Sequence, residues 1–406
     1  MYRLTLNSPL IICEEKVDSN FVKSVDYIPG NRVRAAFAKE ILLQCPLFQK
    51  DKKQDGKYNW VSIRDQDKCK ECDFFNLCSN FGKIRFSFFY PEGTQVIPLS
   101  AERYKCSKCK GFKDGLIKKD KNLDYSSEVC KICDGRIESV YGLRKGKYEY
   151  KLPKIMLEKT AIDSFTLTSR DKQLYTLVAV TEAVKKKDGI EKTRFVGSIS
   201  MQDSEIQNFS IKPICDLRVG AYNSVGFGKV NIEGIDAEEV CDIHSRIEEF
   251  NKRIVSLKNE INGNYIYIPI LFNSHAKLGI ERIPHEKLSS RDIDFKAIWK
   301  ELITEEYENN QIIKRGLNFE FEVEKVYTET QIYRGYDTSL DLEEPREKAI
   351  IINKMGTTVL LKIHKNEYKK AIENLSKAEQ LGIGYETENG YGQVEISNEI
   401  HLKGEI

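Results

Sequence analysis

The segments LRVGAYNSVGFGKV (residues 217–230) and LGIGYETENGYGQV (residues 381–394) follow one pattern. Each begins with Leu, has Gly three residues later, and ends on Gly-aromatic-Gly, a polar residue and Val, in the same register. A repeat of fixed register, separated by most of a domain length, predicts two related domains. Glycines at this spacing let a backbone turn through positive φ and approach another backbone closely. The alternative interpretation is a glycine-rich hairpin before the last strand of each domain.

Length and composition limit the class of protein. The chain has 406 residues, enough for two or three domains with a substantial core. With 40% hydrophobic and 31% charged residues it is expected to be globular rather than disordered. No apolar run approaches the roughly 18 residues that a membrane span requires, and residues 1–13 lack the blocks of a signal peptide. We therefore expect a cytoplasmic protein with no membrane partner. A net charge of +2 does not by itself indicate nucleic acid.

The first half alternates between regular elements and an irregular stretch. An alternating strand is expected at Tyr2–Leu6. The turn Pro29-Gly30-Asn31 predicts the start of a helix, in which Val33, Phe37 and Ile41 recur at helical spacing. Cysteines, lysines and short polar loops then replace periodic structure over residues 45–135. Strands are expected again at residues 164–167 and 193–199.

The second half repeats this mixture of strands and helices. An apolar stripe predicts a connector helix within residues 236–260, formed by Ile243, Ile247, Phe250, Ile254 and Leu257. Further strands are expected at residues 265–271, 319–326, 350–352, 358–363 and 394–396, with a helix from Tyr368 to Ala378. The fold class is thus α+β, with two ferredoxin-like (RRM-like) βαββαβ halves at residues 1–235 and 261–406. The first half contains the cysteine-rich insertion, residues 45–135.

Cysteine spacing gives the most specific chemical signal. Cys106-x-x-Cys109 and Cys130-x-x-Cys133 form two knuckles, and four thiolates on two tight turns can surround zinc tetrahedrally. A second set offers three ligands, Cys69, Cys72 and Cys78, and Cys45 is the nearest upstream candidate for a fourth. An iron–sulfur cluster is the alternative for that set. Neither set has the pattern of a catalytic zinc site, so we expect one structural zinc and allow for two. Cys13, Cys215 and Cys241 are expected in the core.

Basic residues gather at three places. Residues 101–122 contain eight Lys or Arg against three Asp or Glu, interleaved with Tyr104 and Phe112, which suits phosphate contacts and base stacking. A solvated loop is the alternative there. Arg32 and Arg34 fall in the first turn of the expected helix, where free N–H groups already favour an anion. Residues 185–187, three lysines, are expected at a hairpin tip.

Together these residues resemble a known family. The stretch from Ile28 to Ala36 resembles the "IPG-S-x-x-R-G-A" element that opens the helix of CRISPR-associated RAMP proteins, with Ala35 where the family usually has glycine. Residues 160–163, 174–176 and 195–197 resemble the middle of that domain, and both glycine motifs resemble its terminal glycine-rich loop. A cysteine-bearing insertion followed by a second half is most similar to the type III-D subunit in the Cas-five-like position (Csx-ten type). The resemblance covers nearly all of the chain outside residues 45–135.

The resemblance implies a non-catalytic subunit of a type III CRISPR interference complex. Such a subunit holds the 5′ handle of the guide RNA and bridges the large polymerase-like subunit to the RAMP backbone subunits, while target RNA is read by base pairing. Backbone recognition of RNA needs glycine N–H groups, arginines and stacking aromatics. The expected RNA-binding residues are Asn31, Arg32, Arg34, Arg218, Gly220, Tyr222, Gly226, Phe227, Gly228, Lys229, Gly384, Gly390, Tyr391 and Gly392.

Two other classes of function compete with this interpretation. Related subunits cut RNA with a loop aspartate, and Asp26 precedes the Pro-Gly turn where such an aspartate would lie. A lone loop aspartate is more often a turn former, so Asp26 is a weak catalytic candidate and no enzyme activity is expected. The histidines show no pairing in sequence. A free zinc-ribbon adaptor for proteins would require the RAMP motifs to be coincidental.

Overall fold

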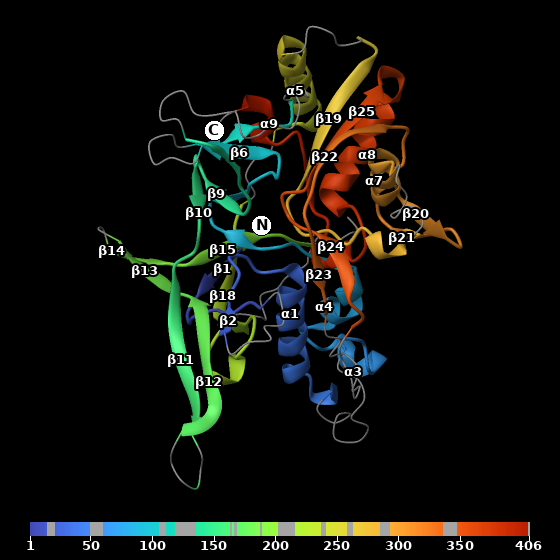
Figure 1. Ribbon diagram of the computed structural model, residues 1–406. Helices are drawn as coiled ribbons and strands as arrows, with labels where there is room; N and C mark the ends of the chain where they lie inside the picture. The colour runs from blue at the N-terminus through green and yellow to red at the C-terminus, as the bar shows by residue number, and fades with distance from the viewer. Residues whose placement is uncertain are drawn as a thin grey trace. The chain divides into compact units, whose positions relative to one another are not determined.

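The protein is described by a computed structural model covering residues 1–13, 21–48, 60–104, 111–117, 135–162, 165, 169–186, 189–201, 216–236, 241–257, 263–284, 293–335 and 347–404 (Figure 1). It is α+β, with several small, mainly antiparallel sheets. The chain divides into two compact units. Unit 1 contains Met1–Glu92, Lys151–Ala237 and Tyr333–Ala349, and unit 2 contains Gly93–Tyr150, Glu238–Ile332 and Ile350–Ile406. In the ranges described, no helix is long and apolar enough to cross a membrane.

The main sheet of unit 1 is built around its first strand. Its antiparallel strands lie in the order β17 (Asp216–Arg218), β18 (Lys229–Gly234), β1 (Tyr2–Leu6), β15 (Arg194–Gly197) and β4 (Tyr90–Pro91). Along the chain, β1 is followed by helix α1 (Gly30–Gln44), β4, β15, and then β17 and β18. Residues 202–215, between β15 and β17, lie outside the described residues. The central strand β1 therefore pairs with the last strand on one side and with β15 on the other.

Helix α1 begins where the sequence predicts. Pro29 is its N-cap residue, because proline fixes φ for a helix start and has no N–H to leave unpaired. The residues expected on one face, Val33, Phe37 and Ile41, are all buried, which confirms the helical spacing. The Phe37 ring lies 5.4 Å from that of Phe86 in β3 (Ile84–Phe86), a strand that pairs with β16 (Ile199–Met201). Two short helices, α3 (Gln66–Lys70) and α4 (Phe75–Asn80), precede β3.

Two hairpins extend unit 1 beyond the main sheet. The longer joins β11 (Lys154–Ile162) to β12 (Ser169–Val180), with β2 (Phe21–Lys23) parallel to β12 (Figure 1). The shorter joins β13 (Ala183–Lys186) to β14 (Gly189–Lys192). A hairpin tip was expected for residues 185–187; Lys185 and Lys186 end β13 next to the turn, and Lys187 lies outside the described residues. Of the strand expected at residues 164–167, only Phe165 is described, and it lies in a turn instead.

The main sheet of unit 2 has the same order around its own central strand. Its antiparallel strands lie in the order β22 (Glu322–Tyr327), β25 (Thr358–His364), β19 (Tyr265–Phe272) and β26 (Val394–Ile396). Along the chain the elements run β19, α7 (Phe295–Ile303), β22, β25, α8 (Tyr368–Leu381) and β26. The smaller strands of this part are β20 (Glu306–Glu308), β21 (Gln311–Lys314), β23 (Thr330–Tyr333) and β24 (Ile350–Asn353).

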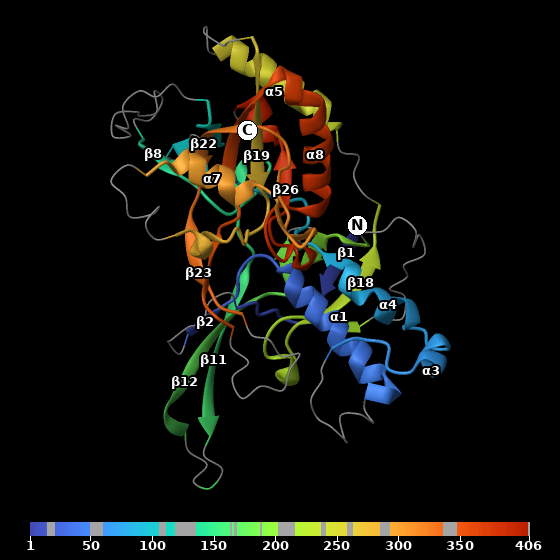
Figure 2. The same ribbon diagram turned by 90° about the vertical axis from the view of Figure 1, so that its right-hand side faces the viewer.

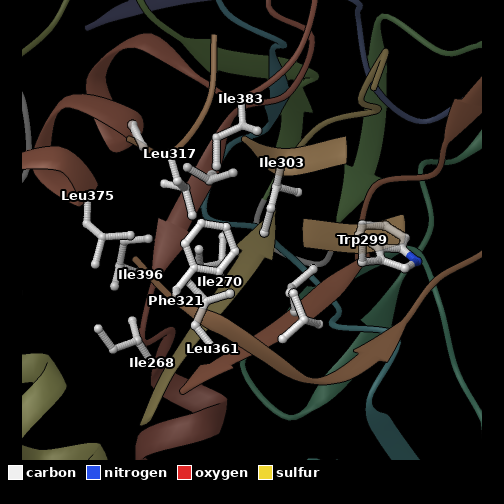
Figure 3. Packing of buried hydrophobic residues seen from close by; sticks show 14 of the residues in the cluster. Ile268, Ile270, Trp299, Ile303, Leu317, Phe321, Leu361, Leu375, Ile383 and Ile396 are labelled. Atoms are coloured by element: carbon white, nitrogen blue, oxygen red, sulfur yellow. The ribbon is translucent and has the colours of Figure 1, made fainter. Parts of the chain in front are cut away.

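Helices α7 and α8 cover one face of this sheet (Figure 2). Figure 3 shows the resulting core, in which Phe321 packs among Ile270, Leu361 and Leu317. Helix α5 (Ile243–Leu257) joins the same unit: Ile243 and Ile247 pack in this core, and Phe250 and Ile254 pack around Leu360. Helix α7 was not predicted from the sequence, although Asp294 caps it by accepting the N–H of Ala297.

Residues Gly93–Tyr150 group with unit 2, although the sequence suggested one insertion, residues 45–135, in the first half. Their apolar side chains explain the difference, since Ile97, Ala101, Phe112 and Val140 pack with Ile400 of the C-terminal helix α9 (Glu399–Lys403). The described residues of this stretch form the short strands β5 (Gln95–Val96), β6 (Ala101–Tyr104), β7 (Lys113–Asp114), β8 (Ile137–Ser139), β9 (Leu143–Lys145) and β10 (Tyr148–Tyr150).

A buried charge cluster ties this stretch to α5 and α9. The Asp114 side chain is fully buried, and its Oδ2 lies 3.3 Å from both Arg253 Nη1 and His401 Nδ1. Its Oδ1 accepts the N–H of Leu116 at 3.0 Å. Burial raises the pKa of Asp114, but His401, the Leu116 N–H and Arg253 outweigh burial and hold the pKa below its usual value. Asp114 is therefore a carboxylate at neutral pH.

Replacing this carboxylate should destabilise unit 2. Asp114→Asn leaves the partly buried Arg253 beside a neutral group, and we expect the free energy of unfolding at pH 7 to fall by about 3 kcal/mol. Because the folded pKa of Asp114 is lowered, its contribution is present above about pH 4 and is lost as the pH falls through the folded pKa. The deficit should therefore shrink in acid. Glu320→Gln, which breaks the exposed 2.6 Å pair with Lys300, is the control and should cost less than about 1 kcal/mol in urea unfolding.

Candidate nucleic-acid interface

The two glycine motifs form the same loop. In each, a non-glycine residue adopts left-handed backbone geometry, Tyr222 at φ 60° and Glu386 at φ 53°. One turn of 3-10 helix follows, Asn223–Val225 in the first loop and Thr387–Asn389 in the second. Left-handed non-glycine residues are uncommon, so their recurrence at the same position indicates two copies of one structure. Each loop leads into the last strand of its sheet, β18 or β26.

Backbone contacts hold each loop against the segment that follows the central strand. Gly228 donates its N–H to Pro9 O at 2.8 Å, and Gly392 donates to His275 O at 2.7 Å. Both glycines have positive φ, and a Cβ would overlap the carbonyl oxygen of Val219 or Ile383. These glycines are therefore required by the approach of one backbone to another.

An Asn-Ser dipeptide completes the repeat, and the sequence interpretation missed it. Ser8 Oγ accepts the N–H of Lys229 at 2.8 Å, and Ser274 Oγ accepts that of Gln393 at 2.8 Å. The preceding asparagines donate their N–H groups to the carbonyls of the same two partners, at 2.8 and 2.7 Å. Both dipeptides directly follow a residue at the end of a central strand, Leu6 or Phe272, so the signal was present in the sequence.

The motif aromatics point into the core rather than outward. Phe227 is 6% exposed and packs with Ile11, Leu177 and Ala179, while Tyr391 is 2% exposed and lies 4.4 Å from the Lys277 ammonium. The N–H groups of Gly226 and Gly390 donate inside the loops, to Asn223 O and Thr387 O. We expected each loop to present its aromatic ring and free glycine N–H groups to RNA. In the structure the rings are buried and these N–H groups donate inside the loops. The flanking glycines instead let each ring fold back beneath its loop.

Charge distinguishes the two loops. Residues 217–230 include Arg218 and Lys229 and no acid, whereas residues 381–394 include Glu386 and Glu388 and no base. Arg218 is exposed and donates weakly to Asn223 O at 3.4 Å, and Glu386 pairs with Lys277 at 2.6 Å. The loop backbones match while their chemistry is opposite. Only the first loop presents positive charge suited to phosphate.

Arg32 lies near this first loop. Cys13 interacts with both. Burial raises the pKa of Cys13, and the positive charge of Arg32 opposes that rise. Cys13 also packs on the same apolar cluster as Tyr222 of the first loop. Burial is the main cause that raises the pKa of Tyr222, and the nearby Cys13 raises it further. Within the described residues the Arg32 side chain makes no hydrogen bond or ion pair, and it is exposed. The N-terminus of α1 beside it has no side-chain cap and no acid in its first turn. Arg32 is thus available to an anion.

The other two polar residues of this helix start have protein partners. Arg34 donates to Phe81 O at 3.1 Å and Ile84 O at 3.3 Å, and its guanidinium lies 5.2 Å from the centre of the Phe81 ring. Asn31 donates to the Tyr333 hydroxyl at 3.3 Å. Arg34 therefore fastens α1 to the segment before β3, which is a different role from the phosphate contact expected.

The catalytic candidate is paired with a lysine. Asp26 Oδ1 lies 2.8 Å from Lys154 Nζ, which also donates to Ser24 O at 2.6 Å. This pair ties the loop before α1 to the start of β11. His275 is buried, and its Nδ1 accepts the N–H of Met355 at 3.0 Å, as suits a residue near a strand end.

The cysteine sets fall into two groups. Cys106, Cys109, Cys130 and Cys133 lie outside the described residues. Cys45, Cys69, Cys72 and Cys78 are free thiols, and burial together with the neighbouring thiolates of Cys72, Cys45 and Cys69 raises the pKa of Cys78 to about 12. Over the part of the chain that the structure describes, no three His, Cys, Asp or Glu side chains are placed to hold a metal ion. The second set gathers without forming such a site.

Comparison with known proteins gives structural likeness only. No protein-family model matches the sequence, and no curated protein matches it. A chain of the cryo-EM structure of the type III-B Cmr-beta bound to cognate target RNA and AMPPnP aligns over 92% of this chain and 93% of its own, at 12% identity and TM-score 0.41. A chain of the same complex bound to cognate target RNA aligns over 97% and 95%, at 10% identity and TM-score 0.40. One from the apo state covers 57% of this chain and 95% of its own, at 11% identity and TM-score 0.25.

The loop glycines should differ sharply in their tolerance of a methyl group. In Gly228→Ala and Gly392→Ala the added Cβ would overlap a carbonyl oxygen, so the free energy of unfolding should fall by more than about 2 kcal/mol. Gly226→Ala is the matched control, since its φ is also positive but no atom lies within 4 Å of the added Cβ. It should cost roughly 1 kcal/mol. Equal losses in thermal unfolding for Gly226 and Gly228 variants would contradict the close approach.

Proposed function

We propose that this chain is a non-catalytic guide-RNA-binding RAMP subunit of a type III CRISPR complex, built from two ferredoxin-like halves. The observation that carries the proposal is the recurrence of one glycine loop at the same place in two sheets of the same strand order. The elements β19, α7, β22, β25, α8 and β26 of unit 2 follow the βαββαβ sequence. In unit 1, β1, α1, β4, β15 and β18 match five of these six elements, and residues 202–215, where the second helix would fall, lie outside the described residues. The IPG element at the start of α1 supports the same family.

The finer assignment rests on the resemblance in sequence. We propose the Cas-five-like position of a III-D-like complex, holding the 5′ handle of the guide and contacting the large subunit and the backbone subunits. The two units then have different tasks. The first loop, with Arg218, Lys229 and the nearby Arg32, faces the RNA backbone, whereas the acidic second loop suits a protein neighbour. Such a complex acts in the cytoplasm.

Binding rather than cleavage is the activity we propose. The Asp26 carboxylate is engaged by Lys154, a pairing that accounts for this residue without a catalytic role. Cleavage of repeat RNA or of guide-complementary RNA by the purified chain, abolished by Asp26→Ala, would replace this proposal with the endoribonuclease alternative.

Arg32 and Arg34 should separate RNA binding from folding. Arg32→Ala should weaken binding of the purified chain to repeat RNA of any sequence by about tenfold. The slope of log affinity against log salt should fall in magnitude by about 0.7, the value for one phosphate on a single strand. Arg34→Ala should lower the melting temperature, because its partners are Phe81 and Ile84.

Lys39→Ala is the matched control for Arg32. Lys39 is exposed on α1, two turns farther along the same face as Arg32. Lys39→Ala therefore removes the same charge at a different place on the helix. Equal effects of Arg32→Ala and Lys39→Ala on the salt slope would mean that the RNA does not lie at the helix start.

We also propose structural zinc, on the basis of cysteine spacing. Cys106, Cys109, Cys130 and Cys133 would hold one ion as two knuckles, because four thiolates on two tight turns can surround zinc tetrahedrally. The set of Cys45, Cys69, Cys72 and Cys78 is the candidate for a second ion. Its short turn, in which Cys72 donates its N–H to Cys69 O at 3.0 Å, brings two of these thiols close in the chain.

Elemental analysis of the freshly purified chain should find about one to two zinc ions per chain. Cys106→Ser with Cys109→Ser should remove one ion and leave the rest of the fold intact, since metal binding and local folding are coupled. Cys241→Ser is the control, because its thiol is exposed and outside both sets. Zinc below about half an ion per chain would contradict the proposal.

A further inference from the structure

Unit 2 contains a cavity that belongs neither to the glycine loops nor to the buried charge cluster. It has a volume of about 250 Å³ and lies between the β20–β21 hairpin and the last turns of α8. Its polar and aromatic lining consists of Tyr307, Arg315, Asn318, Asn374 and Lys377, with Glu305 at one side. Ile312, Ala378 and Leu381 add an apolar surface. A concave site with an apolar wall and a few convergent polar groups is typical of a small-ligand pocket.

Two positive charges in this cavity lack an acidic partner. Among the described residues, neither the Arg315 guanidinium nor the Lys377 ammonium makes a hydrogen bond or ion pair. Arg315 is half-buried, and Glu305, the acid of the lining, accepts the hydroxyl of Tyr307. Unpaired cations converging on one cavity favour an anion there.

Among the residues that the structure describes, buried cations elsewhere in unit 2 are paired with acids, whereas the half-buried Arg315 and the exposed Lys377 are not. Lys277 lies 2.6 Å from Glu386, Arg246 lies 2.9 Å from Glu379, and Lys314 pairs with Glu306. Lys377 lies four residues before the end of α8, and the last turn of this helix contains no basic residue.

The backbone that carries Arg315 is fixed on both sides. Arg315 and Gly384 exchange two backbone hydrogen bonds, at 3.2 and 2.8 Å, so the second glycine loop holds this residue in place. At the next residue, Gly316, a Cβ would lie 2.5 Å from the backbone of Thr304 and Glu305. Because the backbone is already fixed, no loop has to be ordered when the Arg315 side chain binds a ligand.

The remaining groups suit a flat polar ring. The Tyr307 side chain is 53% exposed, so part of its ring is available for stacking. Asn374 Oδ1 accepts the N–H of Asn318 at 3.0 Å, and Asn318 Nδ2 lies 3.4 Å from the Tyr307 hydroxyl. These contacts orient two side-chain amides beside the ring, where they can meet the edge of a base.

We infer that this cavity binds a nucleoside phosphate, with the phosphate between Arg315 and Lys377 and the base against Tyr307. The same chemistry is offered by a free nucleotide and by one nucleotide of an RNA strand. Only the second source rests on the proposed function, because it requires the chain to hold RNA.

The test uses the full chain and three probes, AMP, adenosine and inorganic phosphate, titrated by calorimetry. AMP should bind, and Arg315→Ala or Lys377→Ala should weaken its binding by about tenfold. Tyr307→Leu should weaken AMP but leave phosphate unchanged, because it removes only the stacking surface. Lys370→Ala is the matched control, since Lys370 is exposed on the same face of α8 two turns earlier. It should leave AMP binding unchanged.

Outcomes for the two sources are distinct. Loss of repeat-RNA affinity in Arg315→Ala at unchanged thermal stability, together with AMP binding, assigns the site to an RNA nucleotide. AMP binding that is sensitive to Arg315→Ala, with RNA affinity unchanged, assigns it to a free nucleotide. If AMP does not bind, or binds equally to wild type and Arg315→Ala, the inference is overturned. Sensitivity of RNA binding to Arg32→Ala would then leave the proposed function standing.

Discussion

The approach of a glycine loop to the segment after the central strand governs the architecture of each unit. Gly228 and Gly392 donate their N–H groups to Pro9 and His275 across gaps that exclude a Cβ. The loop can close only if the last strand lies beside the central one, as β18 does beside β1 and β26 beside β19. Strand order, the burial of the loop aromatic and the position of the Asn-Ser dipeptide all follow from this contact.

One backbone structure thus serves two chemical surfaces. The left-handed residue is a tyrosine in the first loop and a glutamate in the second, and the loop charge changes from positive to negative with it. Backbone hydrogen bonds set the conformation, so the exposed side chains are free to differ. The two loops therefore share a backbone conformation and differ in charge, with the positive charge in the loop of unit 1.

Polar groups within unit 2 illustrate how burial determines their role. Asp114 is fully buried and has Arg253, His401 and backbone N–H groups around it, so its charge holds three segments together. Arg315 is only half-buried and lines a cavity whose acidic residue, Glu305, accepts the hydroxyl of Tyr307 rather than pairing with Arg315. The first arrangement is complete within the chain. The second becomes complete with an anion.

Local patterns in the sequence determined much of this protein. Helical spacing predicted α1 from Val33, Phe37 and Ile41, and alternation predicted β1 from Tyr2–Leu6, because each period reflects one buried face. The strands expected at residues 265–271, 358–363 and 394–396 correspond to β19, β25 and β26. The fixed register of the two glycine motifs likewise predicted two related loops. Helix α7 and the Asn-Ser dipeptides were present as signals but were not recognised.

Only the tertiary structure decided which of the named residues have partners inside the fold. Arg32 and Arg34 both lie near the start of α1, yet Arg34 donates to the carbonyls of Phe81 and Ile84 while Arg32 remains exposed. The glycines that flank Phe227 and Tyr391 suggested that both rings would be exposed to RNA. The same glycines instead allow both rings to turn into the core. Such outcomes depend on contacts between residues far apart in the chain, such as residues 34 and 81 or 8 and 229. No local period encodes these contacts.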